Sequence, residues 1–187
     1  MRLALTAFAV LTLAAPLSAD EITPRLEAAL AAQAAGDLRT LSAELAAASA
    51  AVDAERNRRL EALLPEAPEG MTRTVSADYA AGLAMMGGGS GAEASYSAED
   101  GSYATVMLNI DTPMIAGLMP ALLSPEMAAF MGQKVELGGL TFFDQSGSMT
   151  AIVDQRLLVT VNGGDPETIR KVAGLLDGAA LARFDQP

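Results

Sequence analysis

The 187-residue sequence contains no cysteine, no histidine and no tryptophan. The lack of cysteine excludes disulfide frameworks, thiolate metal sites and cysteine nucleophiles. The lack of histidine removes the commonest general base and the commonest metal ligand, so Ser-His-Asp triads and histidine-based zinc sites are excluded as well. Aromatic residues make up only 4% of the chain, which leaves few of the stacking surfaces that sugar sites use.

Basic residues are also scarce, since 12 Lys and Arg stand against 23 Asp and Glu and the net charge is −11. This acidic balance argues against nucleic acid as a partner, because phosphates are bound by clustered Lys and Arg. The length fits one ordinary domain, or one domain with a small appendage.

Residues 1–19 have the pattern of a cleavable secretory signal. Arg2 is followed by an apolar segment over residues 3–15, then by Pro16 and by the small residues Ser18 and Ala19. The segment is too short to span a bilayer, and the absence of cysteine excludes lipoprotein-type lipid attachment. We therefore expect cleavage after Ala19 and a periplasmic or secreted chain without an integral membrane segment.

Residues 20–66 are predicted to form a helical hairpin. Thr23-Pro24 is typical of a helix start, and Gly36-Asp37 separates this helix from a longer one that Pro65 ends near Leu64. The expected buried seam comprises Leu26, Ala29, Leu30, Leu38, Leu41, Leu45, Ala48 and Val52. An aspartate at Leu41 or Leu45 is therefore expected to destabilise the hairpin. Arg56, Arg58 and Arg59 lie in the last turns, as a small anion-binding patch or, with Glu55 and Glu61 between them, as solvated charges.

The hairpin resembles a single tetratricopeptide-type unit around Ala35-Gly36-Asp37-Leu38. A repeat protein needs about three such units to bury its core. This lone unit is therefore expected to pack on the rest of the chain, on a second copy or on a protein partner.

Residues 67–187 are predicted to form a compact α+β domain. Tight turns between consecutive strands imply antiparallel pairing, and helices are expected on one face of the sheet. Asp165-Pro166 is expected to open the last long helix and Gly178 to end it. The expected strands are residues 72–77, 92–97, 103–111, 135–137, 140–143, 149–153 and 157–161.

Several segments resemble an uncharacterised family of exported bacterial proteins. The resembling residues are Ala35–Leu38, Leu63–Gly70, Met86–Gly89, Tyr96, Asp111–Met114 and Leu157–Val161. The match covers most of the chain after residue 19, and it implies no catalytic residues. At the level of the fold, the expected sheet with flanking helices is more distantly similar to Mog1/PsbP-like proteins, whose members are mostly accessory or binding proteins.

Two motifs invite a site. Asp144, Ser146 and Ser148 copy the D-x-S-G-S of a metal-dependent adhesion site, but only 39 residues follow, so a hairpin turn is the preferred interpretation. Gly87–Gly91 lacks the Lys-Ser/Thr of a phosphate-binding loop, and a strand is expected after it, so it is interpreted as a flexible loop.

Other candidates are single residue types in loose patterns. The methionines, among them Met85, Met86, Met114, Met119, Met127 and Met131, fit copper ligands, a pliable apolar groove or simple space filling. Glu99-Asp100 is interpreted as a solvated turn, Asp111 as a helix cap, and Thr168 with Lys171 as ordinary helix residues rather than a nucleophile pair.

No catalytic, cofactor-binding or metal-binding residues are predicted. The sequence favours an exported, non-enzymatic binding or accessory module that uses the hairpin for docking. Two alternatives stay open: a carrier of a small hydrophobic ligand in a methionine-lined groove, and a hydrolase that works with carboxylates alone.

Overall fold

The computed structural model describes residues 21–113, 115, 117, 132–145 and 147–186, so the expected signal at residues 1–19 lies outside the described residues. The described part divides into two compact units between Ala51 and Val52, within one long helix. The elements, in order, are α1 (Ile22–Ala35), α2 (Leu38–Glu61), β1 (Met71–Val75), α3 (Tyr79–Met85), β2 (Ser90–Ala98), β3 (Tyr103–Ile110), β4 (Gln133–Leu137), β5 (Leu140–Gln145), β6 (Ser148–Val153), β7 (Leu157–Gly163), α6 (Pro166–Ala173) and α7 (Gly178–Ala182).

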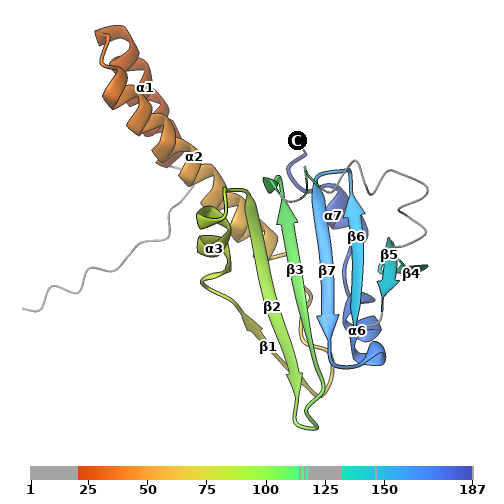
Figure 1. Ribbon diagram of the computed structural model, residues 1–187. Helices are drawn as coiled ribbons and strands as arrows, with labels where there is room; N and C mark the ends of the chain where they lie inside the picture. Colours follow the sequence, from red (N-terminus) through yellow and green to blue (C-terminus); the bar gives the residue numbers. More distant parts are fainter. Residues whose placement is uncertain (1–20, 114, 116, 118–131, 146, 187) are drawn as a thin grey trace, which may run out of the picture. The chain divides into compact units, whose positions relative to one another are not determined.

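The first unit is the predicted helical hairpin of α1 and the first part of α2 (Figure 1). Gly36 adopts φ +73° at the end of α1, and the Asp37 carboxylate accepts a hydrogen bond from Thr40 N at 3.1 Å, so the predicted turn and cap are confirmed. Arg25 Nη1 lies 3.2 Å from Glu44 Oε2 and joins the two helices. The helix begins at Ile22, one residue before the Thr23-Pro24 pair that predicted its start, so Thr23 lies inside α1 and does not cap it.

The seam of the hairpin is made of alanines, and the prediction that leucines fill it is wrong. Ala29, Ala32 and Ala48 are buried, whereas the side chains of Leu38 and Leu45 are 74% and 49% exposed. Small alanines allow close approach of two helices, and that approach leaves no room between them for a row of leucines. The leucines therefore point to one side of the seam.

The second unit is built on a seven-stranded sheet with the order β1-β2-β3-β7-β6-β5-β4. Every neighbouring pair is antiparallel, and the pairing of the consecutive strands that tight turns join is as predicted. One continuous row of side chains crosses four strands, since Ala94 pairs with Val106, Val106 with Val161, and Val161 with Met149. All four are buried, and this face of the sheet holds the core. The chain is thus an α+β protein.

Helices cover the core face. Ile169 and Val172 of α6, Leu181 of α7, and Leu60 near the end of α2 belong to the core cluster. The sequence-based boundary was placed after Glu66; Leu60 joins the core of the second unit, which is why the last turns of α2 belong to that unit.

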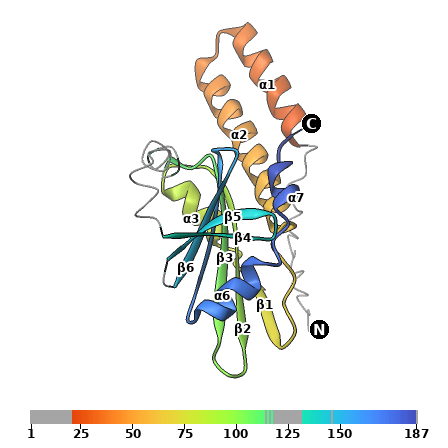
Figure 2. The same ribbon diagram turned by 90° about the vertical axis from the view of Figure 1, so that its right-hand side faces the viewer.

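Short α3, which the sequence did not predict, lies at the opposite face beside β2 (Figure 2). Its Tyr79 Oη donates to Asn109 Oδ1 at 2.9 Å. Asn109 alternates with the core residues Leu108 and Ile110 along β3, and its side chain therefore lies on the other face.

The C-terminal helix differs in part from its prediction. Asp165 caps α6 by accepting from Thr168 N at 2.9 Å, and Pro166 opens it, as expected. Gly178, however, begins α7 rather than ending α6. A side chain there would lie 2.6 Å from the carbonyl oxygen of Gly139, so this glycine serves a close approach of two backbones.

Candidate functional site

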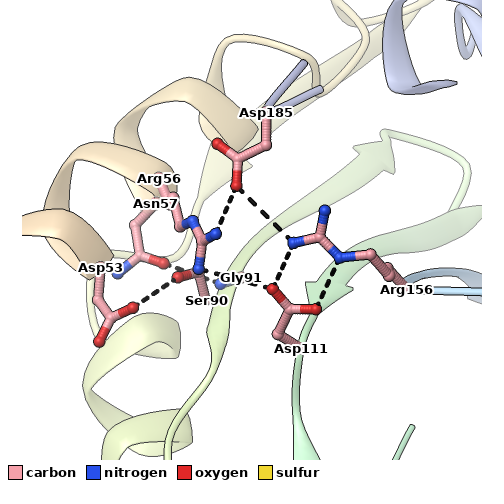
Figure 3. A network of polar contacts seen from close by, with 8 residues as sticks. All are labelled: Asp53, Arg56, Asn57, Ser90, Gly91, Asp111, Arg156 and Asp185. Atoms are coloured by element: carbon pink, nitrogen blue, oxygen red, sulfur yellow. Dashed lines mark hydrogen bonds and ion pairs between the residues drawn. The ribbon is translucent and has the colours of Figure 1, made fainter. Parts of the chain in front are cut away.

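Four charged side chains of the second unit meet where β3 ends and β7 begins (Figure 3). Arg156 Nε and Nη2 donate to Asp111 Oδ1 and Oδ2 at 3.0 and 2.6 Å, a two-pronged pair. Arg56 Nη2 lies 2.7 Å from Asp185 Oδ2, and Arg56 Nη1 lies 3.6 Å from Asp111 Oδ2. We call these four residues the charge cluster.

Local backbone conformation places the cluster. Asp154 and Gln155 have φ of 49° and 58° and form a two-residue turn between β6 and β7, closed by Arg156 N donating to Val153 O at 3.1 Å. Asp111 also has a positive φ of 53°, and its N donates to Arg156 O at 3.3 Å. Asp111 and Arg156 are thus joined through main chain and side chain.

The charges of the cluster alternate, so each arginine lies beside a carboxylate. The hydrogen bonds from Arg156 lower the pKa of Asp111, and the same bonds raise the pKa of Arg156. Neither Arg156 nor Arg56 is left as a free cation for an anionic ligand. The arrangement ties α2, the end of the sheet and the segment after α7 together within the second unit.

The sequence predicts a different role for Asp111 and does not mark Arg156 or Asp185 as site residues. Asp111 was expected to cap the following helix, but Thr112 Oγ1 accepts from Ile115 N at 3.4 Å, and Asp111 instead binds Arg156. Asp111 and Arg156 are 45 residues apart, and no local pattern marks such a pair.

Two hollows flank Arg156. One of about 320 Å³ is lined by five apolar residues together with Asp154, Arg156 and Gln186. Its apolar lining is Ile110, Val153, Leu157, Leu181 and Phe184. We call it the apolar hollow. The other, of about 300 Å³, lies beside Asp111, Pro113 and Ile115.

The end of α2 makes further polar contacts with the start of β2 in the same region (Figure 3). Ser90 Oγ donates to Asp53 Oδ1 at 3.3 Å, and Gly91 N donates to Asn57 Oδ1 at 2.8 Å. A side chain at Gly91 would lie 2.5 Å from the side chain of Leu83. Part of the glycine run expected to be a flexible loop is therefore an ordered strand beginning at Ser90.

A second, polar groove of about 390 Å³ carries both members of the proposed nucleophile pair, Thr168 and Lys171. Lys171 Nζ donates to the carbonyl oxygen of Glu69 at 3.2 Å, so its charge holds the linker before β1. Asp100 also lines the groove and accepts from Ser102 N at 2.8 Å, which makes the Glu99-Asp100 segment a turn. Among the described residues, no three acidic side chains are grouped so as to hold a metal ion.

The adhesion-site motif lies at the turn between β5 and β6. Asp144, its first residue, accepts two hydrogen bonds from Arg170, at 3.2 and 2.6 Å. Ser148 begins β6, while Ser146 lies outside the described residues. The carboxylate that would bind a cation therefore already has a cationic partner.

Two of the three arginines considered as an anion patch share one carboxylate. Arg58 Nη2 and Arg59 Nε lie 2.8 and 2.7 Å from Glu55 Oε1. The hydrogen bonds from Arg58 and then from Arg59 lower the pKa of Glu55 to about 2. The third, Arg56, belongs to the charge cluster.

The described methionines do not share one location. Met149 is buried in the core, while Met85, the last residue of α3, and Met86, which follows it, are exposed. Met114, Met119, Met127 and Met131 lie outside the described residues.

Four leucines of the hairpin are exposed. Leu26, Leu30, Leu38 and Leu45 are 45%, 66%, 74% and 49% exposed. We call these four, with half-buried Leu41, the leucine face.

Helix geometry places these leucines on one side of the hairpin. Successive residues of an α-helix are rotated by about 100° about the helix axis. In each helix the leucines therefore lie to one side of the buried alanines, and the direction of this rotation along the chain is the same in both helices. The helices are right-handed and antiparallel, and such a displacement turns both rows toward the same side. Ile22 and Gln33 lie near this row. Of the charged side chains, Arg25 and Glu44 lie at the seam, and Glu27 lies at the outer edge of the row, three residues before Leu30.

Comparison of the chain with protein-family models, with curated proteins and with solved structures finds no match. The resemblance to a family of exported bacterial proteins therefore stays a prediction. In the part of the chain that the structure describes, no helix has both the length and the hydropathy to cross a membrane.

Proposed function

We propose that the protein is an exported, non-enzymatic binding or accessory module whose leucine face is a docking surface. The observation that carries the proposal is the exposure of four leucines on a hairpin that already has a complete alanine seam. Contiguous exposed apolar surface of this kind typically marks an interaction site. The leucines are not required to hold the two helices together. Because exposure of their apolar side chains to water is unfavourable, their position points to a partner that covers them.

The internal order of the molecule supports a binding role more than a catalytic one. The charged residues of the charge cluster bind one another, and Lys171 and Asp144 each have a partner in the fold. These contacts stabilise the second unit.

A carrier of a small hydrophobic ligand is the second candidate, and the apolar hollow favours it. Its lining from the sheet and from Leu181 fits the expected groove between sheet and helix. Described methionines do not line it, so the methionine-lined form of this hypothesis gains no support there. Native mass spectrometry of protein purified from the periplasm would detect a retained ligand, and Leu181→Trp, which fills the hollow, should abolish its retention.

Photo-crosslinking in the expressing cells tests the docking role. A photoreactive amino acid at Leu30 or Leu45 should yield a covalent adduct with another protein chain, of either the same or a different sequence. The matched controls are the exposed Ala31 and Ala46, which lie on the same helices but away from the leucine face. Equal adduct yields at all four positions, or none at any of them, would contradict the proposal.

A further inference from the structure

We infer that the occupant of the leucine face is a second copy of this chain, so that two hairpins pack face to face as a four-helix bundle. This inference rests on the proposed docking function and names the partner. Three observations support it: the spacing of the leucines, the absence of charge within their row among residues 21–51, and the acidity of the whole chain.

The spacing indicates a helical mate. Leu38, Leu41 and Leu45 follow one another at intervals of three and four residues, and Leu26 and Leu30 are separated by four. Rows with these intervals pack into the matching row of another helix, as in bundles and coiled coils. Within the hairpin the row is not used in this way, since Leu38 and Leu45 stay exposed.

The charge pattern of the hairpin indicates which kind of helical partner fits the leucine face. In residues 21–51, all of them described, the charged side chains are Glu21, Arg25, Glu27, Asp37, Arg39 and Glu44. Arg25 and Glu44 pair across the seam, Arg39 lies away from the leucines, and Glu27 lies at the outer edge of the row, three residues before Leu30. A basic partner protein would find no acidic side chain within the leucine row, and an anionic membrane surface would find no basic one.

A second copy fits such a surface. A twofold interface brings the same patch of both chains together, so any charge on it would meet its own sign. A chain of net charge −11 can pair with itself most readily through surface that carries no charge. The leucine face meets this requirement, and the leucines of one copy can pack against the same leucines of the second copy.

The inference predicts an unusual salt dependence. The two acidic chains repel one another at a distance, and salt screens this repulsion. The dimer should therefore become tighter as sodium chloride is raised. Association with an oppositely charged partner would weaken under the same change.

Sedimentation equilibrium of the full chain as purified is the test. We expect a dimer mass, and we expect Leu30→Glu with Leu45→Glu to raise the dissociation constant by more than about a hundredfold, because four charges enter one apolar interface. Ala31→Glu with Ala46→Glu adds the same charge away from the face and should leave the dimer intact. Circular dichroism establishes that both double variants keep their helices.

A second measurement uses the absence of cysteine, which gives a background without thiols. Single cysteines at Leu30, Leu38 and Leu45 should give chain-to-chain adducts with a short bismaleimide at one position or more, and cysteines at Ala31 and Ala46 should not. A monomeric wild-type chain, or a dimer that the leucine-face charges do not dissociate, would overturn the inference. If the chain is monomeric while the cellular photo-crosslinks join it to a different protein, the docking function stands and only the second copy is wrong.

Discussion

At the scale of single residues, Asp111 lies beside two arginines of the charge cluster. Its two oxygens accept from Arg156, and Arg56 lies 3.6 Å away. Its backbone has a positive φ, which aspartate and asparagine tolerate better than most residues. Asparagine therefore tests the charge of Asp111 with little change in backbone preference.

Asp111→Asn is expected to lower the free energy of unfolding by about 1 kcal/mol or less near neutral pH, since more than a third of the Asp111 side chain is exposed. The hydrogen bonds from Arg156 hold the folded-state pKa of Asp111 below its ordinary value of 3.8, so its contribution is present above that pH and is lost as pH falls through the folded-state value. Urea denaturation should show the difference between wild type and variant closing in acid. Glu99→Gln removes an equal charge from an exposed turn and should show no such difference.

A second residue-scale prediction concerns Tyr96, which is fully buried and donates its hydroxyl hydrogen to Pro65 O at 2.6 Å. Tyr96→Phe removes the donor and should cost about 1–3 kcal/mol, because the buried carbonyl loses its hydrogen bond. Tyr103→Phe, at a side chain 53% exposed, is the control and should cost little.

The pH dependence of the Tyr96 effect has a definite sign. Burial raises the pKa of Tyr96 from 10.0 to about 12. A raised pKa means that the stabilisation is complete below pH 10 and falls as pH rises toward about 12, because the unfolded chain loses its proton first. Unfolding free energies measured across this range should therefore converge for wild type and Tyr96→Phe, and a constant difference would contradict the assignment.

At the scale of elements, the alanine seam explains how the hairpin holds together without its leucines. Ala29 and Ala32 of α1 and Ala48 of α2 are buried, and Arg25 with Glu44 closes the edge of the same seam. Alanine also has the highest helix propensity, so the same residues favour the helices and their close packing. Leu45→Asp is accordingly no longer expected to bury a charge in this seam.

Ala29→Leu should lower the free energy of unfolding of the hairpin by about 1–3 kcal/mol, since a larger side chain forces the two helices apart. Ala31→Leu places the same side chain at an exposed position of α1 and should change stability little. Thermal melts followed by the helical circular dichroism signal would compare the two. Equal melting temperatures for both variants would show that α1 and α2 do not approach as closely as described.

The elements that the sequence predicted well are those with a local signal. Alternation from Tyr103 onward predicted β3, and Asp165-Pro166 predicted the start of α6. The error in the hairpin arose because two stripes of residues have helical spacing, one of leucines and one of alanines. The spacing alone does not determine which of the two stripes is buried; the packing of the two helices does. The charge cluster could not be predicted, because Arg56, Asp111, Arg156 and Asp185 are far apart in the chain and carry no common motif.

At the scale of the whole molecule, the proposed export would change the net charge of the chain. An acidic chain without cysteine needs neither disulfides nor a reducing compartment, and it is compatible with the periplasm or the medium. Removal of residues 1–19 would also remove Arg2, the basic residue of the segment, and make the net charge −12. The exported form would then be more acidic than its precursor, and still more dependent on uncharged surface for contact with another copy.

The export proposal predicts one mass. The chain recovered from the periplasm or the medium of an expressing bacterium should begin at Asp20 and end at Pro187, as measured by intact-protein mass spectrometry. Ala19→Arg places a large charged residue where the processing enzyme requires a small one, so this variant should keep residues 1–19 and stay with the membrane fraction. Ala31→Arg adds the same charge beyond the signal and should be processed normally. A wild-type chain that retains Met1 and stays in the cytoplasm would show that residues 1–19 are not a cleaved signal, and the proposed export would be wrong.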